Sequence, residues 1–267
     1  MRSHVLGDLT SAELTGLPPG ATLVIPVGAT EQHGPRLPVR TDAVVSEQVA
    51  LRAAAEAGPG VLVAPVLAYG SSHHHLPYPG TLSLRGRTLL AVLADLIDSA
   101  ARTGFHRIVV FNGHGGNDDL IRQAARDAVL DHEITVAAAS YWTLGGERLA
   151  ELARAAGIHH VPGHAGAFEA ALLLGLGIEP VGSPPWPQSP QGPQSPHSPG
   201  SSGSSAPPAD PPPPVERAFV AEHGWVARID GTTDPVAPAT PEAGRRLLDH
   251  LVHEFAAFLT AFSARPA

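Results

Sequence analysis

The chain contains no cysteine and no run of apolar residues long enough to span a membrane. Without cysteine, a disulfide framework and a thiolate metal site are both excluded. Basic residues are in the minority, with 17 Lys and Arg against 25 Asp and Glu, so the formal net charge is −8. This charge opposes binding to nucleic acid or to an anionic membrane. Residues 1–8 also lack the apolar core of a signal peptide, so we expect a cytoplasmic protein that acts on a small or peptidic molecule.

A chain of 267 residues can bury one substantial core without disulfides. Short apolar runs alternate with segments of helical periodicity. Strands are predicted near residues 22–27, 61–66, 107–112 and 134–140, and helices near 43–57, 86–103, 118–130 and 145–156. This alternation predicts an α/β fold of three layers (α/β/α) with a mainly parallel sheet, formed as a single domain over residues 1–267.

Metal-type side chains follow the first predicted strand. The apolar run Leu23–Val27 is followed by Glu31 and His33, and then by Thr41–Asp42. We expect the acidic and histidine side chains to lie on a loop at the carboxyl end of the strand, where open α/β sheets bind ligands. Carboxylate and imidazole groups are ligands for zinc, manganese and iron. The cluster therefore indicates a metal enzyme.

A second cluster follows the third predicted strand, where Ile108–Phe111 runs into Asn112–Asn117 with His114 at its centre. A phosphate-binding loop would also be rich in glycine, but the Lys-Ser/Thr pair that it requires is missing. Asn117–Asp119 are predicted to cap the helix over residues 120–130.

A third cluster is His164–Glu169, which leads into an apolar helix over residues 170–176. Glu169 falls in the first part of that helix, where a carboxylate stabilises the helix dipole. From this segment alone, a capping role for Glu169 is the simpler interpretation.

Taken together, the blocks resemble the creatininase family (creatinine amidohydrolase and its relatives). The matching blocks are Gly28–Gly34, Thr41–Asp42, Asn112–Asn117 and His164–Glu169, with a further match at Tyr69–Ser72, His75 and Pro79–Leu82. The resemblance covers most of the chain outside about residues 183–215. It implies the creatininase-like α/β/α fold and a homo-oligomer, often a hexamer.

The resemblance implies two divalent metal ions (Zn, Mn or Fe). Their ligands would be Glu31, His33, His114 and Asp42, with Asp42 bridging the two ions. Creatininase itself has a second-site Glu two residues after the histidine of the Asn-Gly-His block, where this chain has Gly116. We expect Glu169 to complete the second site, and Gly116→Glu to strengthen it.

His164 matches the histidine of the last block and is expected to act as the proton shuttle, with Glu169 as the second catalytic residue. Two bridged cations would activate a water molecule and polarise the carbonyl of an amide.

The expected substrate-binding residues are Ser72, His75, Gly113, Gly115 and Trp142. The backbone N–H groups of the two glycines could stabilise an oxyanion. The run of three histidines at 73–75 could equally be a surface metal trap or a solvated loop. Trp142, after the fourth strand, could form a substrate wall or belong to the core or an interface.

Two segments remain outside these blocks. Residues 183–214 are rich in Pro, Ser and Gly and are expected to form a disordered or polyproline-like surface insertion. The last predicted helix, about residues 241–262, carries one apolar stripe that indicates docking or a subunit contact. The stripe consists of Leu247, Leu248, Leu251, Phe255 and Phe258.

The combined reading is a metal-dependent amidohydrolase that cleaves a non-standard C–N bond, in an amide or cyclic amide of a small molecule. Two alternatives inside the family are a peptidase that trims a ribosomal peptide in mycofactocin-type maturation and a deformylase. An alternative of another class is a non-catalytic scaffold that acts through the Pro-rich insertion.

Overall fold

The computed structural model describes residues 3–18, 20–182 and 224–265. Within these ranges the chain forms one parallel sheet of four strands in the order β2-β1-β3-β4. The strands are β1 (Thr22–Val27), β2 (Val61–Val63), β3 (Arg107–Asn112) and β4 (Thr135–Ser140). The insertion expected at residues 183–214 lies outside the described residues.

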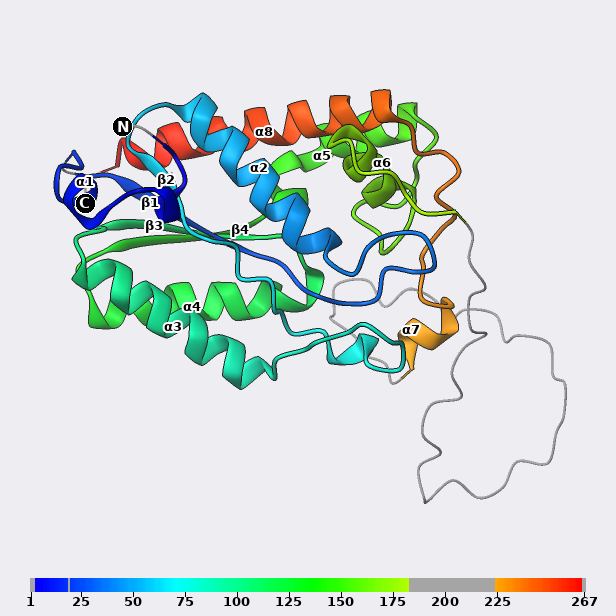
Figure 1. Cartoon of the computed structure of the whole chain (residues 1–267), viewed down its shortest axis with the longest axis horizontal. Coiled ribbons are helices and arrows are strands. Elements are labelled where there is room, and N and C mark those ends of the chain that lie inside the picture. Colours follow the sequence, from blue (N-terminus) through cyan, green and yellow to red (C-terminus); the bar gives the residue numbers. More distant parts are fainter. Residues whose placement is uncertain (1–2, 19, 183–223, 266–267) are drawn as a thin grey trace, which may run out of the picture.

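Helices cover both faces of this sheet, which confirms the expected three-layer α/β/α fold (Figure 1). One face carries α2 (Thr41–Ala57), α5 (Tyr141–Ala155), α6 (Ala167–Gly175) and α8 (Pro241–Ser263). The other face carries α3 (Gly86–Arg102) and α4 (Asp118–Asp131). The remaining described helices are short: α1 (Ser11–Thr15), α7 (Trp225–Arg228), and the 3-10 turns η1 (Leu6–Asp8), η2 (His73–His75) and η3 (Gly115–Asn117).

Each central strand contributes to two apolar cores. In β3, Val109 and Phe111 pack into the core beneath α2, α6 and α8, whereas Ile108 and Val110 pack into the core beneath α3 and α4. A strand buried on both faces reads as an uninterrupted apolar run. For this reason the sequence located β1 and β3 correctly.

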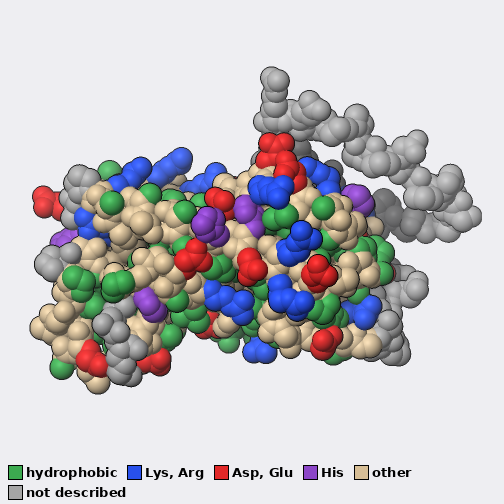
Figure 2. All heavy atoms as spheres, turned by 90° about the horizontal axis from the view of Figure 1, so that it is seen from above, with side chains coloured by type: hydrophobic (Ala, Val, Ile, Leu, Met, Phe, Trp, Pro, Cys, Tyr) green, Lys and Arg blue, Asp and Glu red, His purple; other side chains and the backbone are tan. Residues whose placement is uncertain are grey.

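The last helix, α8, docks along its own chain, as the apolar stripe suggested. Phe255 is fully buried and its ring stacks on Phe111, with ring centroids 3.9 Å apart. Thr240 caps the helix, since its hydroxyl accepts a hydrogen bond from the N–H of Ala243. Basic and acidic side chains are interspersed over the outer face of this layer (Figure 2). None of the helices in the described ranges is both long and apolar enough to cross a membrane.

Several element boundaries differ from the prediction. Helix α6, for example, begins at Ala167 rather than at residue 170. Strand β2 ends at Val63 rather than near residue 66, because Pro65 has no N–H to donate to a neighbouring strand. The helix predicted from residue 145 begins at Tyr141 instead, with a break at Gly146, whose φ of 58° is readily adopted only by glycine. Helix α2 begins at Thr41 and so includes Asp42.

Candidate metal centre

The candidate site lies at the carboxyl edge of the sheet, and every described strand contributes to it. The contributing residues are Glu31 and His33 after β1, His74 and His75 after β2, His114 after β3, and Tyr141 and Trp142 after β4. His164 and Glu169 enter from the segment that starts α6. The structure thus brings together the six residues that sequence reasoning assigned to metal binding and proton transfer.

Asp42 lies between two histidines and turns one carboxylate oxygen toward each. Its Oδ1 is 3.1 Å from Nε2 of His33, and its Oδ2 is 3.1 Å from Nδ1 of His114. Asp42 stands in the first turn of α2, not on the preceding loop where the sequence placed it. A carboxylate in the first turn is stabilised by the helix dipole, which explains the earlier start of this helix.

Glu31 is fully buried and faces three imidazole rings. Its Oε2 lies 3.3 Å from Nδ1 of His114, and its Oε1 lies 3.3 Å from Nε2 of His75 and 3.6 Å from Nδ1 of His164. Glu31 and Asp42 therefore share His114 between them. His33 is shared in the same way between Asp42 and Glu169, whose Oε1 is 3.7 Å from Nε2 of His33.

The hydrogen bonding around these groups fits a divalent cation. Both carboxylate oxygens of Glu31 and Oδ2 of Asp42 are buried and accept no hydrogen bond. Each metal-type histidine uses the ring nitrogen that faces away from the carboxylates to donate to a backbone carbonyl. His33 donates Nδ1–H to the carbonyl of Glu31, and His114 donates Nε2–H to the carbonyl of Ser71. The ring nitrogen that faces the carboxylates is then the one that can bind a metal, as in histidine ligands held by a backbone carbonyl.

His75 and His164 have the opposite arrangement, which Gln32 imposes. The buried Gln32 amide nitrogen donates to Nδ1 of His75 at 2.9 Å and to Nε2 of His164 at 2.8 Å. The amide orientation is fixed because its oxygen accepts the N–H of Gly34. Since these two ring nitrogens accept, the other nitrogen of each neutral ring carries the proton and directs it toward Glu31.

The ionisation of the rings follows the same division. Burial opposes protonation of His114, but the charges of Glu31 and Asp42 outweigh burial and raise its pKa to about 10. For His33, burial is likewise outweighed by Asp42 and Glu169, and the pKa is raised well above its usual value. Burial and the neighbouring histidines lower the pKa of His75 and His164 instead. Without metal, one pair is held charged and the other neutral.

Glu169 contacts both the start of α6 and the candidate metal centre. Its Oε2 accepts the N–H of Ala165 just ahead of α6, while its Oε1 faces His33. Burial raises the pKa of this carboxyl group. The first N–H of the helix, that of Ala167, is capped from the C-terminal part of the chain by Asp234.

The two asparagines of the second block form the scaffold for His114. Asn112 accepts the N–H of His114 and donates to its carbonyl oxygen. Asn117 donates to the carbonyl of Gly28 and accepts the N–H of Ser71, so it joins the loops after three strands. The prediction that Asn117 caps the next helix was wrong in this respect, since its side chain makes no capping hydrogen bond.

A cavity of about 740 Å³ opens over the cluster and is walled by aromatic and glycine residues. Of the expected substrate-binding residues, His75, Gly113, Gly115 and Trp142 line it. Ser72 is not among the lining residues. Its hydroxyl lies 3.2 Å from Nε2 of His114, the ring nitrogen that faces away from the carboxylates. The N–H of Gly113 is donated to the carbonyl of Val27 and is therefore not an oxyanion donor.

Sequence reasoning assigned no role at the site to several residues that lie there. Among them, His74 and Trp225 line the cavity, and Gln32 lies between the two neutral histidines. Gln32 lies inside the first block, but the residues next to it in sequence do not indicate that it contacts His164, 132 positions away. His74 is one of three adjacent histidines. The backbone turn of η2 directs their side chains into different environments, and of the three only His75 is buried.

A parallel α/β sheet with buried carboxylate and imidazole groups at its carboxyl edge defines a class of protein that can hold divalent cations at that edge. Solved structures of similar shape include a creatininase variant in a Zn–Zn form and a manganese form of creatininase, with TM-scores of 0.74 and 0.72. Each is 26% identical to this chain over 99% of it and 100% of the other chain. The family model described as creatinine amidohydrolase matches residues 7–259, and the chain therefore belongs to the creatininase family.

Curated relatives from two branches of this family are also similar. A mycofactocin precursor peptide peptidase of Mycobacterium ulcerans is 38% identical over 133 residues, 47% of this chain and 53% of that protein. A creatinine amidohydrolase of Pseudomonas putida is 31% identical over 192 residues, 66% of this chain and 72% of that protein. The chain thus spans about half the length of the mycofactocin relatives that it matches.

Proposed function

We propose that this chain is a metal-dependent hydrolase that cleaves an amide C–N bond with water. The observation that carries the proposal is the position of Asp42, whose two oxygens belong to two separate groups of donors. In one group, Asp42 lies with His33 and Glu169. In the other group, Asp42 and Glu31 each direct one oxygen toward Nδ1 of His114. Each group would hold one divalent cation, with Asp42 as the bridge.

Two bound cations would supply Lewis acidity, which polarises a carbonyl and lowers the pKa of water. Hydrolysis adds the oxygen of water to the carbonyl carbon, breaks the C–N bond and leaves the nitrogen with one more proton. We assign the transfer of that proton to His164, whose ring lines the cavity beside Glu31.

The size of the cavity favours a substrate larger than a single small ring. A volume of about 740 Å³ lies in the range of roughly 300–1,000 Å³ that accommodates drug-sized ligands. Tyr141, Trp142 and Trp225 give it an aromatic wall suited to an apolar side chain. A peptide end is therefore the second candidate beside a cyclic amide, in keeping with the peptidase names among the relatives.

The first test is metal content by elemental analysis of the full chain purified without a tag, followed by a screen of cyclic amides, formamides and short peptides. We expect about two equivalents of metal, loss of hydrolysis after treatment with a chelator, and recovery with Zn²⁺ or Mn²⁺. A chain that takes up no metal even on reconstitution would contradict the proposal. That outcome would favour the non-catalytic scaffold.

A further inference from the structure

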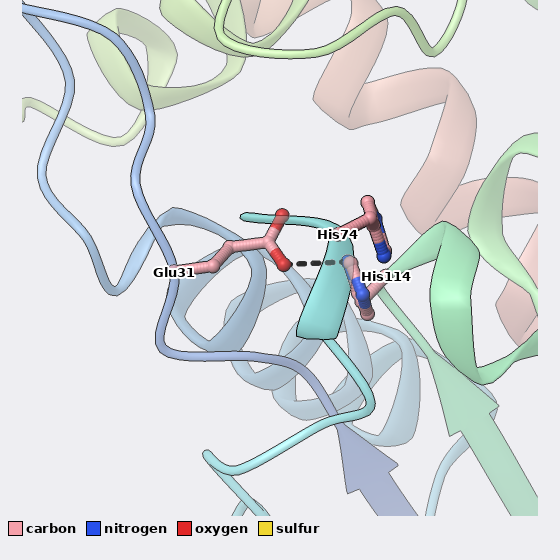
Figure 3. A group of neighbouring side chains, drawn as sticks. All are labelled: Glu31, His74 and His114. Carbon is pink, nitrogen blue, oxygen red and sulfur yellow. Dashed lines mark ion pairs between the residues drawn. The ribbon is translucent and has the colours of Figure 1, made fainter. Parts of the chain in front are cut away.

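His74 lies beside the group that contains Glu31 and His114. The three side chains converge from different loops, and each offers one ligand atom within 4.8 Å of the other two (Figure 3). The His74 ring stacks nearly parallel to that of His114, with centroids 5.7 Å apart and an interplanar angle of 8°. Unlike Glu31 and His114, His74 is exposed to solvent.

The place of the His74 ring depends on the glycine at position 116. A Cβ atom on Gly116 would stand 3.1 Å from Cε1 of His74 and 2.6 Å from Nε2 of His114. A longer side chain at that position would extend into the space that the two stacked rings share. The glycine therefore leaves room for His74 to approach Glu31 and His114.

We propose that His74 is a fourth protein ligand at the position formed by Glu31, Asp42 and His114. This inference rests on the proposed metal-dependent function. The position then offers two imidazole and two carboxylate donors, whereas the His33, Asp42 and Glu169 position offers one imidazole and two carboxylates. Imidazole donors suit zinc, while oxygen-rich sites suit manganese. His74 would thus give the two positions different metal preferences.

The test is titration of the metal-free full chain with Zn²⁺, Mn²⁺ and Co²⁺ in the presence of a competing chelator. His74→Ala and His74→Gln should each weaken Zn²⁺ binding at one of two equivalents by about 10-fold or more, since even the supporting partners of ligands are worth 10–100-fold. Mn²⁺ binding should change less. The visible absorption of the Co²⁺ form should change as well, because the number of nitrogen donors falls.

His73→Ala is the matched control, since His73 is the adjacent residue of the same turn and its ring pairs with the hydroxyl of Ser83. This variant should keep the affinity and the Co²⁺ spectrum of the unaltered chain. If the unaltered chain binds no metal, the proposed function itself fails. If it binds two equivalents and both His74 variants keep the same affinity and spectrum, only the assignment of His74 is overturned.

Discussion

Gly116 lies so close to Ser71 that a Cβ atom at position 116 would overlap the Ser71 carbonyl oxygen. That oxygen accepts the Nε2–H of His114, so the same atom both excludes a side chain and orients a metal-type histidine. This contact argues against the expectation that Gly116→Glu would strengthen the second site, because a glutamate there would push against backbone. Glu169 stands beside His33 and Asp42, in the other donor group.

Gly116→Ala should destabilise the metal-free protein by about 1–3 kcal/mol, the usual cost of overpacking a tight site. The added methyl group must move the Ser71 backbone or the His114 ring. Urea denaturation monitored by circular dichroism would measure the change. Gly115→Ala is the control, because a Cβ atom at Gly115 meets nothing within 4 Å. Equal stability of the two variants would contradict the close approach.

Asp42→Ala should lose both metal ions and nearly all activity. The carboxylate contributes one oxygen to each donor group, so neither group is complete without it. We expect activity to fall by at least about 10²–10³-fold, the range seen on loss of a single transition-state-stabilising group. Asp119→Ala is the control for metal content, since Asp119 lines the same cavity but belongs to none of the donor groups. Two retained equivalents of metal in Asp42→Ala would refute the bridging position.

Gln32→Leu should lower kcat by about 10–100-fold while metal content stays the same. The leucine side chain cannot donate to His75 and His164, so the proton-bearing nitrogen of each ring is no longer fixed. Kinetics and elemental analysis on the same preparation would separate the two effects. Gln32→Glu offers a second comparison, because a carboxylate keeps the size of the side chain and removes the donor. Unchanged kcat in both variants would show that the amide has no positioning role.

Local patterns were sufficient to predict the strands and to place the candidate metal ligands at their carboxyl ends. The strands are short apolar runs because both faces of the sheet are buried, and Glu31, His33 and His114 follow those runs directly. The boundaries of helices were less accessible, since Gly146 breaks a helix by a backbone angle that the periodicity of apolar residues does not encode.

Long-range contacts explain what the sequence did not predict. Asn117 looked like a helix cap, but it bonds to Gly28 and Ser71, which lie 89 and 46 positions away. His74 and His75 are adjacent in sequence, yet His75 is buried against Gln32 and His74 is exposed beside His114. Such assignments depend on which loops meet at the sheet edge, and spacing along the chain does not contain that information.

Divalent-cation affinity should rise with pH between about pH 6 and 9. Nδ1 of His114 must lose its proton to bind a cation, and in the metal-free protein this proton is held with a pKa of about 10. His33, whose pKa is also raised, must likewise lose a proton before it binds a cation. This second proton also makes the cation affinity rise with pH. Protonation therefore competes with the cation at every pH below these pKa values, and the competition weakens as pH rises.

Isothermal titration of metal-free protein with Zn²⁺, in buffers of different ionisation enthalpy, would count the protons released. We expect nearly two at neutral pH for the unaltered chain and one fewer for His114→Asn. His160→Asn is the control, because His160 is exposed and stands 3.7 Å from Asp234, away from both donor groups. Binding that releases no protons would mean that His33 and His114 are neutral before the cation arrives, and so are not held charged by Asp42, Glu31 and Glu169.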